Sequence, residues 1–131
     1  MENTKCVVFV FVKEGKFLVE KRPETEEIDP GKVTVPGGHV EDNESLEDAL
    51  VRECKEEIGA EPAEYRKFYE GKYTTGKENM TCYYYVVMKW KGKIQAKEAA
   101  TLGWLRFSEV DKLDVPIDRE AIMALKNSTD K

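Results

Sequence analysis

Histidine is almost absent from this sequence, and cysteine is scarce. The single histidine is His39, so a Ser-His-Asp triad, a Cys-His pair or a multi-histidine metal site would all depend on one residue. We therefore expect carboxylates to carry most acid–base and metal chemistry if the protein is an enzyme. The three cysteines are far apart and form no CxxC pair, which favours buried thiols in a reducing compartment over disulfides or a zinc site.

Long hydrophobic runs and an excess of positive charge are also missing. The longest apolar run, residues 6–12, is too short to cross a bilayer and has the β-branched and aromatic content of a strand. The opening residues, MENTK, lack the charge pattern of a secretory signal, so we expect a cytoplasmic protein. The net charge of −5 argues against nucleic acid polymers and anionic membranes as partners. A small-molecule substrate is favoured.

The pattern of turns and apolar residues predicts one domain over residues 1–126, followed by a frayed tail over 127–131. Glu14-Gly15 is typical of a hairpin turn, and Pro36-Gly37-Gly38 is expected to end a short strand. We expect helices over roughly 46–58 and 118–126, with a helical turn near 107–113. The predicted strands cover 5–13, 16–21, 33–35, 64–75, 80–90 and 103–107. This order predicts an α+β fold, or a mixed sheet between helices.

The first predicted helix has clear ends but an unusual charge pattern. Ser45 with Asp48 is a capping pair, and Gly59 stops the helix. A core stripe recurs every four residues: Leu46, Leu50, Cys54 and Ile58.

Three carboxylates crowd one face of its last turns. Glu53, Glu56 and Glu57 stand at i, i+3 and i+4, where like charges repel and the negative end of the helix dipole opposes them. A bound divalent cation with oxygen ligands would reverse this repulsion. Arg52 lies at i,i+4 from Glu56 and can orient it. The competing interpretation is a solvated acidic face.

The loop before the helix favours the metal interpretation. Gly37 and Gly38 have no Cβ, so their backbone can approach a ligand or metal closely. Residues 37–60, GGHVEDNESLEDALVRECKEEIGA, resemble the Nudix box, G-x5-E-x7-R-E-U-x-E-E-x-G-U, where U is a bulky aliphatic residue. Seven fixed positions are in register: Gly38, Glu44, Arg52, Glu53, Glu56, Glu57 and Gly59. Two U positions depart, because Cys54 and Ala60 are smaller than usual.

The resemblance implies a MutT-like Nudix hydrolase, with an α/β/α sandwich around a central mixed, largely antiparallel sheet. Such enzymes cleave the pyrophosphate bond of a nucleoside diphosphate linked to another group, using Mg²⁺ or, as a substitute, Mn²⁺. Glu53, Glu56 and Glu57 would ligate or assist the metal, together with the carbonyl of Gly37. Metal ions neutralise phosphate charge and activate water near neutral pH. The resemblance gives a structural role to Gly38, Glu44, Arg52 and Gly59: they would brace the loop and helix.

Weaker matches lie outside the box. Arg22 stands where many MutT-like proteins carry an arginine that meets substrate phosphate, although an exposed surface arginine explains it equally well. Glu98, six residues before Trp104, stands where many relatives place a glutamate that binds metal or acts as general base. A solvated loop glutamate is the alternative for Glu98. We assign no catalytic role to His39.

Candidates for contacts with the base are Tyr73, the run CYYYVV (residues 82–87) and Asp118-Arg119, while the backbone of Gly37 and Gly38 would also face substrate. One face of the tyrosine strand would stack on a purine, or the tyrosines would pack across strands. Asp118 stands near a family position that reads the purine edge. An exposed aspartate capping the last helix explains it equally well.

The favoured substrate is a (d)NTP, including oxidised purine nucleotides, with release of a nucleoside monophosphate. ADP-ribose or another nucleotide sugar is the alternative, although the proline that often marks ADP-ribose hydrolases is missing between Pro62 and Pro116. A non-catalytic nucleotide sensor is the alternative of another class, but such domains typically lose a box carboxylate and none is lost here. Homodimers are common in the family, so the resemblance also allows a homodimer.

Overall fold

The fold is built around a strand that is buried on both faces. The computed structural model describes residues 2–24, 31–97 and 101–129. Within the first strand, β1 (Glu2–Lys13), residues 6–11 are all buried. Because successive side chains of a strand point to opposite faces, the apolar run feeds two separate cores. One core contains Cys6, Val8 and Val10, and the other contains Val7, Phe9 and Phe11.

The sheet is mixed, with one parallel pair at its centre. Its strands are ordered β3-β2-β1-β6-β5, while β4 also pairs with β1 and β7 with β2. Only β1 and β6 run parallel among the strand pairs of the described residues, and the other pairs are antiparallel. The further strands are β2 (Lys16–Lys21), β3 (Val33–Thr34), β4 (Gly37–His39), β5 (Glu61–Thr74), β6 (Glu78–Lys91) and β7 (Thr101–Arg106).

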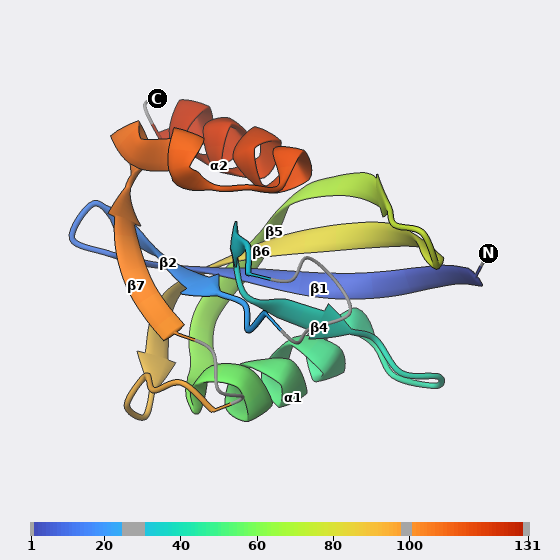
Figure 1. Cartoon of the computed structure of the whole chain (residues 1–131). Coiled ribbons are helices and arrows are strands. Elements are labelled where there is room, and N and C mark those ends of the chain that lie inside the picture. The colour runs from blue at the N-terminus through green and yellow to red at the C-terminus, as the bar shows by residue number, and fades with distance from the viewer. Residues whose placement is uncertain (1, 25–30, 98–100, 130–131) are drawn as a thin grey trace.

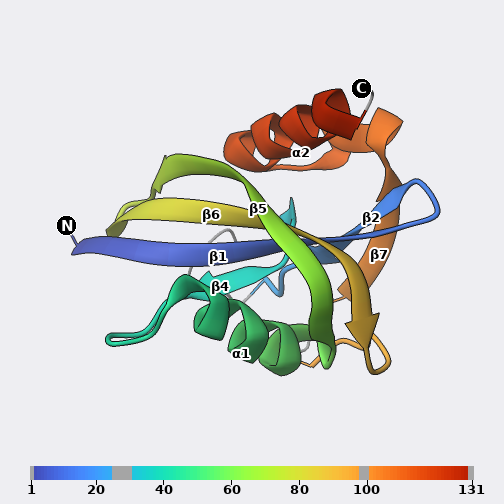
Figure 2. The ribbon, with the colours of Figure 1, turned by 180° about the vertical axis from the view of Figure 1, so that it is seen from behind.

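One helix covers each face of the sheet, as Figures 1 and 2 show from opposite sides. Helix α1 (Leu46–Ile58) closes the core that contains Phe9 and Phe11. Helix α2 (Pro116–Thr129), preceded by the 3₁₀ helix η1 (Phe107–Lys112), closes the other core. Neither helix is long and apolar enough to span a membrane, and the same holds for every helix in the described part of the chain. The predicted α/β/α sandwich is confirmed.

Several element boundaries differ from the prediction, and one strand was not predicted. Strand β3 ends before Pro36-Gly37-Gly38, as expected, but the two glycines then begin the unpredicted strand β4, in which Gly37 lies opposite Val8 of β1. This pairing depends on glycine, because a Cβ on Gly37 would lie 2.6 Å from the carbonyl oxygen of Val7. Strand β5 begins at Glu61 rather than 64, and β7 at Thr101 rather than 103. Helix α2 is longer than predicted at both ends, spanning 116–129 rather than 118–126.

Candidate functional site

The caps of α1 fix the direction in which its carboxylates point. The hydroxyl oxygen of Ser45 accepts the backbone N–H of Asp48 at 3.0 Å, which satisfies an open amide of the first turn. At the other end, Gly59 has φ 71° and donates its N–H to the carbonyl of Lys55. Cys54 and Ile58 are completely buried against the sheet, and the carboxylate of Glu53, beside Cys54, lies next to Gly38 of strand β4.

Glu53 of helix α1 lies against the backbone of Gly38, in the Gly37-Gly38 segment of β4 that we call the glycine loop. Glu53 is only 8% exposed. A Cβ on Gly38 would lie 2.1 Å from its carboxylate, so only glycine leaves room for this buried carboxylate against the backbone. Glu57 is half-buried and Glu56 exposed on the same side of α1. The glycine loop therefore presents backbone atoms directly to the acidic face of the helix.

Arg52 connects four parts of this region through one planar side chain. Its Nε and Nη2 donate to the two carboxylate oxygens of Glu44 at 2.7 and 2.9 Å. Nη2 also donates to the carbonyl of His39 at 2.9 Å. Nη1 donates to Glu53 at 2.9 Å and to Glu56 at 3.0 Å. The guanidinium group of Arg52 thus links the loop of residues 39–44 to the helix. Its contact with Glu56 has the i,i+4 spacing from which it was predicted.

These hydrogen bonds, together with burial, shift the pKa values of Glu44, Glu53 and Arg52. The hydrogen bonds from Arg52 and from the backbone N–H of Glu41 hold the pKa of Glu44 at about 2. Burial raises the pKa of Glu53, while the hydrogen bond and charge of Arg52 oppose that rise. The carboxylates raise the pKa of Arg52 further above its already high value. Glu44 is therefore a stable anion, whereas the ionised form of Glu53 depends on a positive neighbour.

The chemistry of these donors fits a hard divalent cation. Within the described residues, no three His, Cys, Asp or Glu side chains lie close enough together to form a metal-binding group. Instead, one nitrogen of Arg52 bonds both Glu53 and Glu56. A divalent cation is an alternative positive partner for the same oxygens, and Mg²⁺ prefers carboxylates and keeps several waters. Glu53, Glu56, Glu57 and the backbone of Gly37 and Gly38 supply only oxygen donors of that kind.

A pocket opens on the other side of the glycine loop, below the start of α2. Its volume is about 100 Å³. Gly37 and Gly38 form part of its wall, together with Arg22, Tyr73 and Asp118. The two glycines therefore separate the pocket from the carboxylates of α1.

Asp118 is held deep in this pocket. It is 5% exposed, and its two carboxylate oxygens accept the backbone N–H of Val35 at 3.0 Å and the hydroxyl of Tyr84. The interpretation of Asp118 as an exposed helix cap is therefore wrong. Helix α2 begins at Pro116, two residues earlier than that interpretation assumed, so Asp118 lies inside the first turn and faces the core. Its orientation is fixed by partners on β6 and next to β4.

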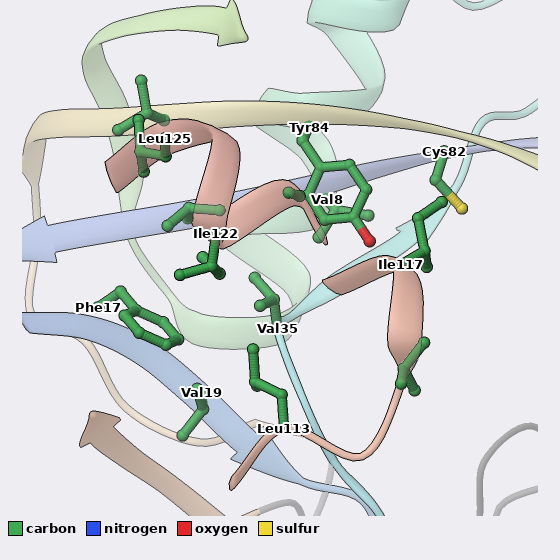
Figure 3. Close-up of a cluster of buried hydrophobic side chains, with 14 of the residues drawn as sticks. Val8, Phe17, Val19, Val35, Cys82, Tyr84, Leu113, Ile117, Ile122 and Leu125 are labelled. Atoms are coloured by element: carbon green, nitrogen blue, oxygen red, sulfur yellow. The ribbon is translucent and has the colours of Figure 1, made fainter. Parts of the chain in front are cut away.

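The tyrosine run divides between the two faces of the sheet. Tyr84 packs edge-on against Phe68 and Tyr69 and lines the pocket, and Figure 3 shows it close to Val8 on the α2 side. Burial and the charge of Asp118 raise the pKa of Tyr84. Tyr85 points to the opposite face and contacts Tyr65. Cross-strand packing is therefore confirmed as one use of these rings.

The remaining candidates are placed as follows. Arg22 is half-buried in the pocket wall, with Nη1 3.5 Å from the carboxylate of Glu20, so it is not a freely exposed surface arginine. His39 is exposed, and its Nε2 lies 2.8 Å from the carboxylate of Glu78. Glu98 lies outside the described residues, so its assignment stays a prediction.

Several pocket residues were not found from the sequence. The hydroxyl of Thr34 is buried and has no hydrogen-bond partner within the described part of the chain, and it lines the pocket. Cys6, Met80 and Cys82 also line it. Strand alternation shows which of these residues share a face, but it does not show that β1 and β6 are neighbours.

Comparisons with known proteins agree with this geometry. The family model described as NUDIX domain matches residues 3–125. The 8-oxo-dGTP diphosphatase of Buchnera aphidicola subsp. Schizaphis graminum (strain Sg) is 30% identical, over 88% of this chain and 87% of its own. The CTP pyrophosphohydrolase of Escherichia coli (strain K12) is also 30% identical, over 96% of each chain. A crystal structure of the MutT protein from Methanosarcina mazei Go1 shares the fold, with a TM-score of 0.85, 19% identity and coverage of 99% and 97%.

Proposed function

Because this chain belongs to the NUDIX domain family and is therefore a hydrolase of pyrophosphate bonds in nucleotides, we propose that its substrate is a nucleoside triphosphate, cleaved to a nucleoside monophosphate and pyrophosphate. The two relatives described above are named for 8-oxo-dGTP and CTP, and both compounds are nucleoside triphosphates. We include oxidised purine nucleotides among the candidate substrates.

The single observation that carries this proposal is that Gly37 and Gly38 lie between the pocket and the carboxylates of α1. Gly37 and Gly38 border the pocket on one side, and Gly38 contacts the carboxylate of Glu53 on the other. A nucleotide with its base in the pocket would therefore carry its phosphates across the glycine backbone to the acidic face of α1.

Glu53, Glu56 and Glu57, with the carbonyl of Gly37, are the residues we assign to divalent cations, with Mg²⁺ as the physiological ion and Mn²⁺ as a substitute. When bound, such ions neutralise phosphate charge and lower the pKa of bound water. Arg52 keeps Glu53 and Glu56 oriented. Because it also binds Glu44 through both oxygens, its position does not depend on the two carboxylates it orients.

The other roles follow from position. Arg22 would bind a phosphate oxygen from the pocket wall, since a guanidinium donates two parallel hydrogen bonds to such a group. Asp118 would accept a hydrogen bond from the edge of the base, and its contacts with Val35 and Tyr84 fix its orientation beforehand. Glu98 is proposed as the general base that accepts a proton from the attacking water.

Product analysis tests the proposal. The protein is incubated with Mg²⁺ and one of the common or oxidised (d)NTPs, ADP-ribose, NADH or a diadenosine polyphosphate, and products are separated by chromatography. We expect a nucleoside monophosphate and pyrophosphate from at least one triphosphate, and no product with EDTA. Preferential cleavage of ADP-ribose or NADH would overturn the assignment of a triphosphate substrate.

A pair of substitutions on α1 tests the assigned ligands. Glu57→Gln should lower turnover at least about a hundredfold, because loss of a ligand should exceed the effect of losing a group that supports a ligand. Glu47→Gln is the matched control, since Glu47 lies on the same helix but in its first turn. Full turnover by Glu57→Gln would remove Glu57 from the metal site.

A further inference from the structure

Three sulfur-containing side chains, Cys6, Met80 and Cys82, line the pocket together. Cys6 in β1 lies directly opposite Cys82 in β6 within the parallel pair, and Met80 precedes Cys82 by two residues, so all three side chains share one face of the sheet. The Sγ atom of Cys6 donates a hydrogen bond to the Sδ atom of Met80 at 3.2 Å. Their exposed fractions are 8% for Cys6 and 5% each for Met80 and Cys82.

These sulfurs are buried but face a cavity. Cys6, Met80 and Cys82 all belong to the pocket wall, and Figure 3 shows Cys82 on the α2 side of the sheet with Tyr84 and Ile117. Cys54, the third cysteine, is completely buried in the opposite core beneath α1. An ion that enters the pocket therefore reaches two thiols and a thioether without any unfolding.

Thiols and thioethers are soft ligands, which select monovalent copper over Mg²⁺ or Ca²⁺. Zinc is a poorer match, because structural zinc sites use four ligands from cysteine, histidine or carboxylate. We propose that Cys6, Met80 and Cys82 form a binding site for a soft monovalent cation such as Cu(I), on the floor of the nucleotide pocket.

The charge of the site suits a monovalent ion. The neighbouring Cys82 and burial raise the pKa of Cys6, so the ion must displace a proton: Cys–SH and Cu⁺ give Cys–S–Cu and H⁺, without oxidation or reduction. One thiolate neutralises the ion, and the second thiol and the thioether complete a neutral set of three ligands. With metal–sulfur bonds of roughly 2.3 Å, as in zinc thiolates, the sulfurs of Cys6 and Met80, now 3.2 Å apart, need to separate by less than about one ångström. The flexible Met80 side chain can supply that movement.

Occupation of this site would hinder nucleotide binding, since the pocket holds only about 100 Å³. That consequence rests on the proposed function, whereas binding of copper does not. An experiment can therefore overturn the copper site without overturning the proposed substrate, and the reverse. A protein that binds Cu(I) but cleaves no nucleoside triphosphate would leave the copper site intact and overturn the proposed substrate.

The test is an anaerobic titration of the whole chain against a chromophoric Cu(I) chelator, with native mass spectrometry to count bound ions. We expect one copper ion per chain in the wild type and in the control Cys54→Ala, and none in Cys82→Ala. Met80→Leu conserves volume and should fold normally. Its Cu(I) affinity should fall at least about tenfold, since even groups that only support a ligand have effects of that size.

Equal Cu(I) affinity in the wild type, Cys82→Ala and Met80→Leu would overturn the proposed site. So would a wild-type chain that loses two hydrogens to an internal disulfide and takes up no metal. If Cys82→Ala proves unfolded by circular dichroism, the comparison of Met80→Leu with Cys54→Ala decides the question. In the nucleotide assay, Cu(I) should inhibit the wild type and Cys54→Ala alike, and unchanged turnover with one bound ion would overturn the inhibitory effect.

Discussion

The two sides of the glycine loop are built on different principles. On the α1 side, nearly all interacting groups come from residues 37–60, and charge dominates: Arg52 contacts Glu44, Glu53 and Glu56. On the α2 side, the pocket is largely apolar, and its buried carboxylate, Asp118, depends on residues far away in the chain. The first region can form with one helix and its preceding loop, whereas the second needs the whole sheet.

The two regions should therefore contribute to the stability of the fold through different kinds of interaction. The charged region is partly open to solvent, so each ion pair contributes modestly unless one group serves several partners. The buried region contains fewer polar contacts, but a missing partner there leaves a desolvated group unsatisfied. Substitutions in the two regions should therefore change the free energy of unfolding by different amounts and with different pH dependence.

The largest effect on stability should come from Arg52→Ala. Four residues lose a hydrogen bond from one side chain. We expect the free energy of unfolding to fall by about 2 kcal/mol in urea titrations, less than the roughly 3–5 kcal/mol of a broken buried ion pair, because the Arg52 side chain is 24% exposed. Arg52→Lys should lie between Arg52→Ala and the wild type, because an ammonium group cannot reproduce the planar fork. The control is Arg66→Ala, at an exposed position of β5. Equal losses at positions 52 and 66 would show that the network is not a stabilising unit.

On the α2 side, Tyr84→Phe should lower the free energy of unfolding by roughly 1–2 kcal/mol, because Asp118 loses a buried donor. Tyr83→Phe is a matched control on the neighbouring position, whose side chain faces the opposite core, and its effect should stay within about 0.5 kcal/mol. Thermal and urea unfolding of both variants measure the difference. If the two variants match, the contact between Tyr84 and Asp118 does not stabilise the pocket.

A smaller effect is the pH dependence of stability that Glu44 contributes on the α1 side. The pKa of Glu44 is about 2 in the folded chain against an ordinary value of 4.5. Because this pKa is lowered, ionised Glu44 stabilises the fold above about pH 4.5, and that stability is lost as the pH falls toward 2. The difference in stability between wild type and Glu44→Gln should therefore shrink in this window. Glu64→Gln, at an exposed carboxylate of β5, should show a smaller change, and an equal change would refute the origin assigned to the shift.

The smallest effect concerns repulsion along α1. Without divalent cations, Glu57→Gln should raise the free energy of unfolding by a few tenths of a kcal/mol, roughly the size of a like-charge pair at helical spacing. Glu47→Gln should act in the opposite sense, since a carboxylate in the first turn interacts favourably with the helix dipole. Thermal unfolding in EDTA gives both values. Stabilisation by both substitutions would mean that net charge, rather than position on the helix, controls the effect.

The same contrast explains how much could be predicted from sequence. Caps, core stripe and the contact between Arg52 and Glu56 depend on spacing within one helix, and all were predictable. The partners of Asp118 were not, because Tyr84 and Val35 become its neighbours only through pairing across the sheet. Its burial was missed for the same reason, since an aspartate at the start of a helix is typically an exposed cap.

For the fold, strands with strong periodicity were predicted within a few residues, and β4 was not. Its three residues carry no pattern of their own, and their pairing with β1 follows from the room that glycine leaves beside Val7. The sandwich as a whole was implied by the resemblance carried by residues 37–60. The sequence alone left open which strands run parallel, because that depends on the path of the chain.

The parallel pairing of β1 with β6 has a consequence for biosynthesis. Residues 2–11 pair with residues 78–87, so at roughly 5–20 residues per second the ribosome needs several seconds to supply the partner strand. During that interval β1 can form a hairpin with β2, but its other edge stays unpaired and carries the run CVVFVFV. Such an exposed, uncharged edge is a template for association with other chains. The strand that joins both cores of the finished protein is thus open to association with other chains until β6 has been synthesised.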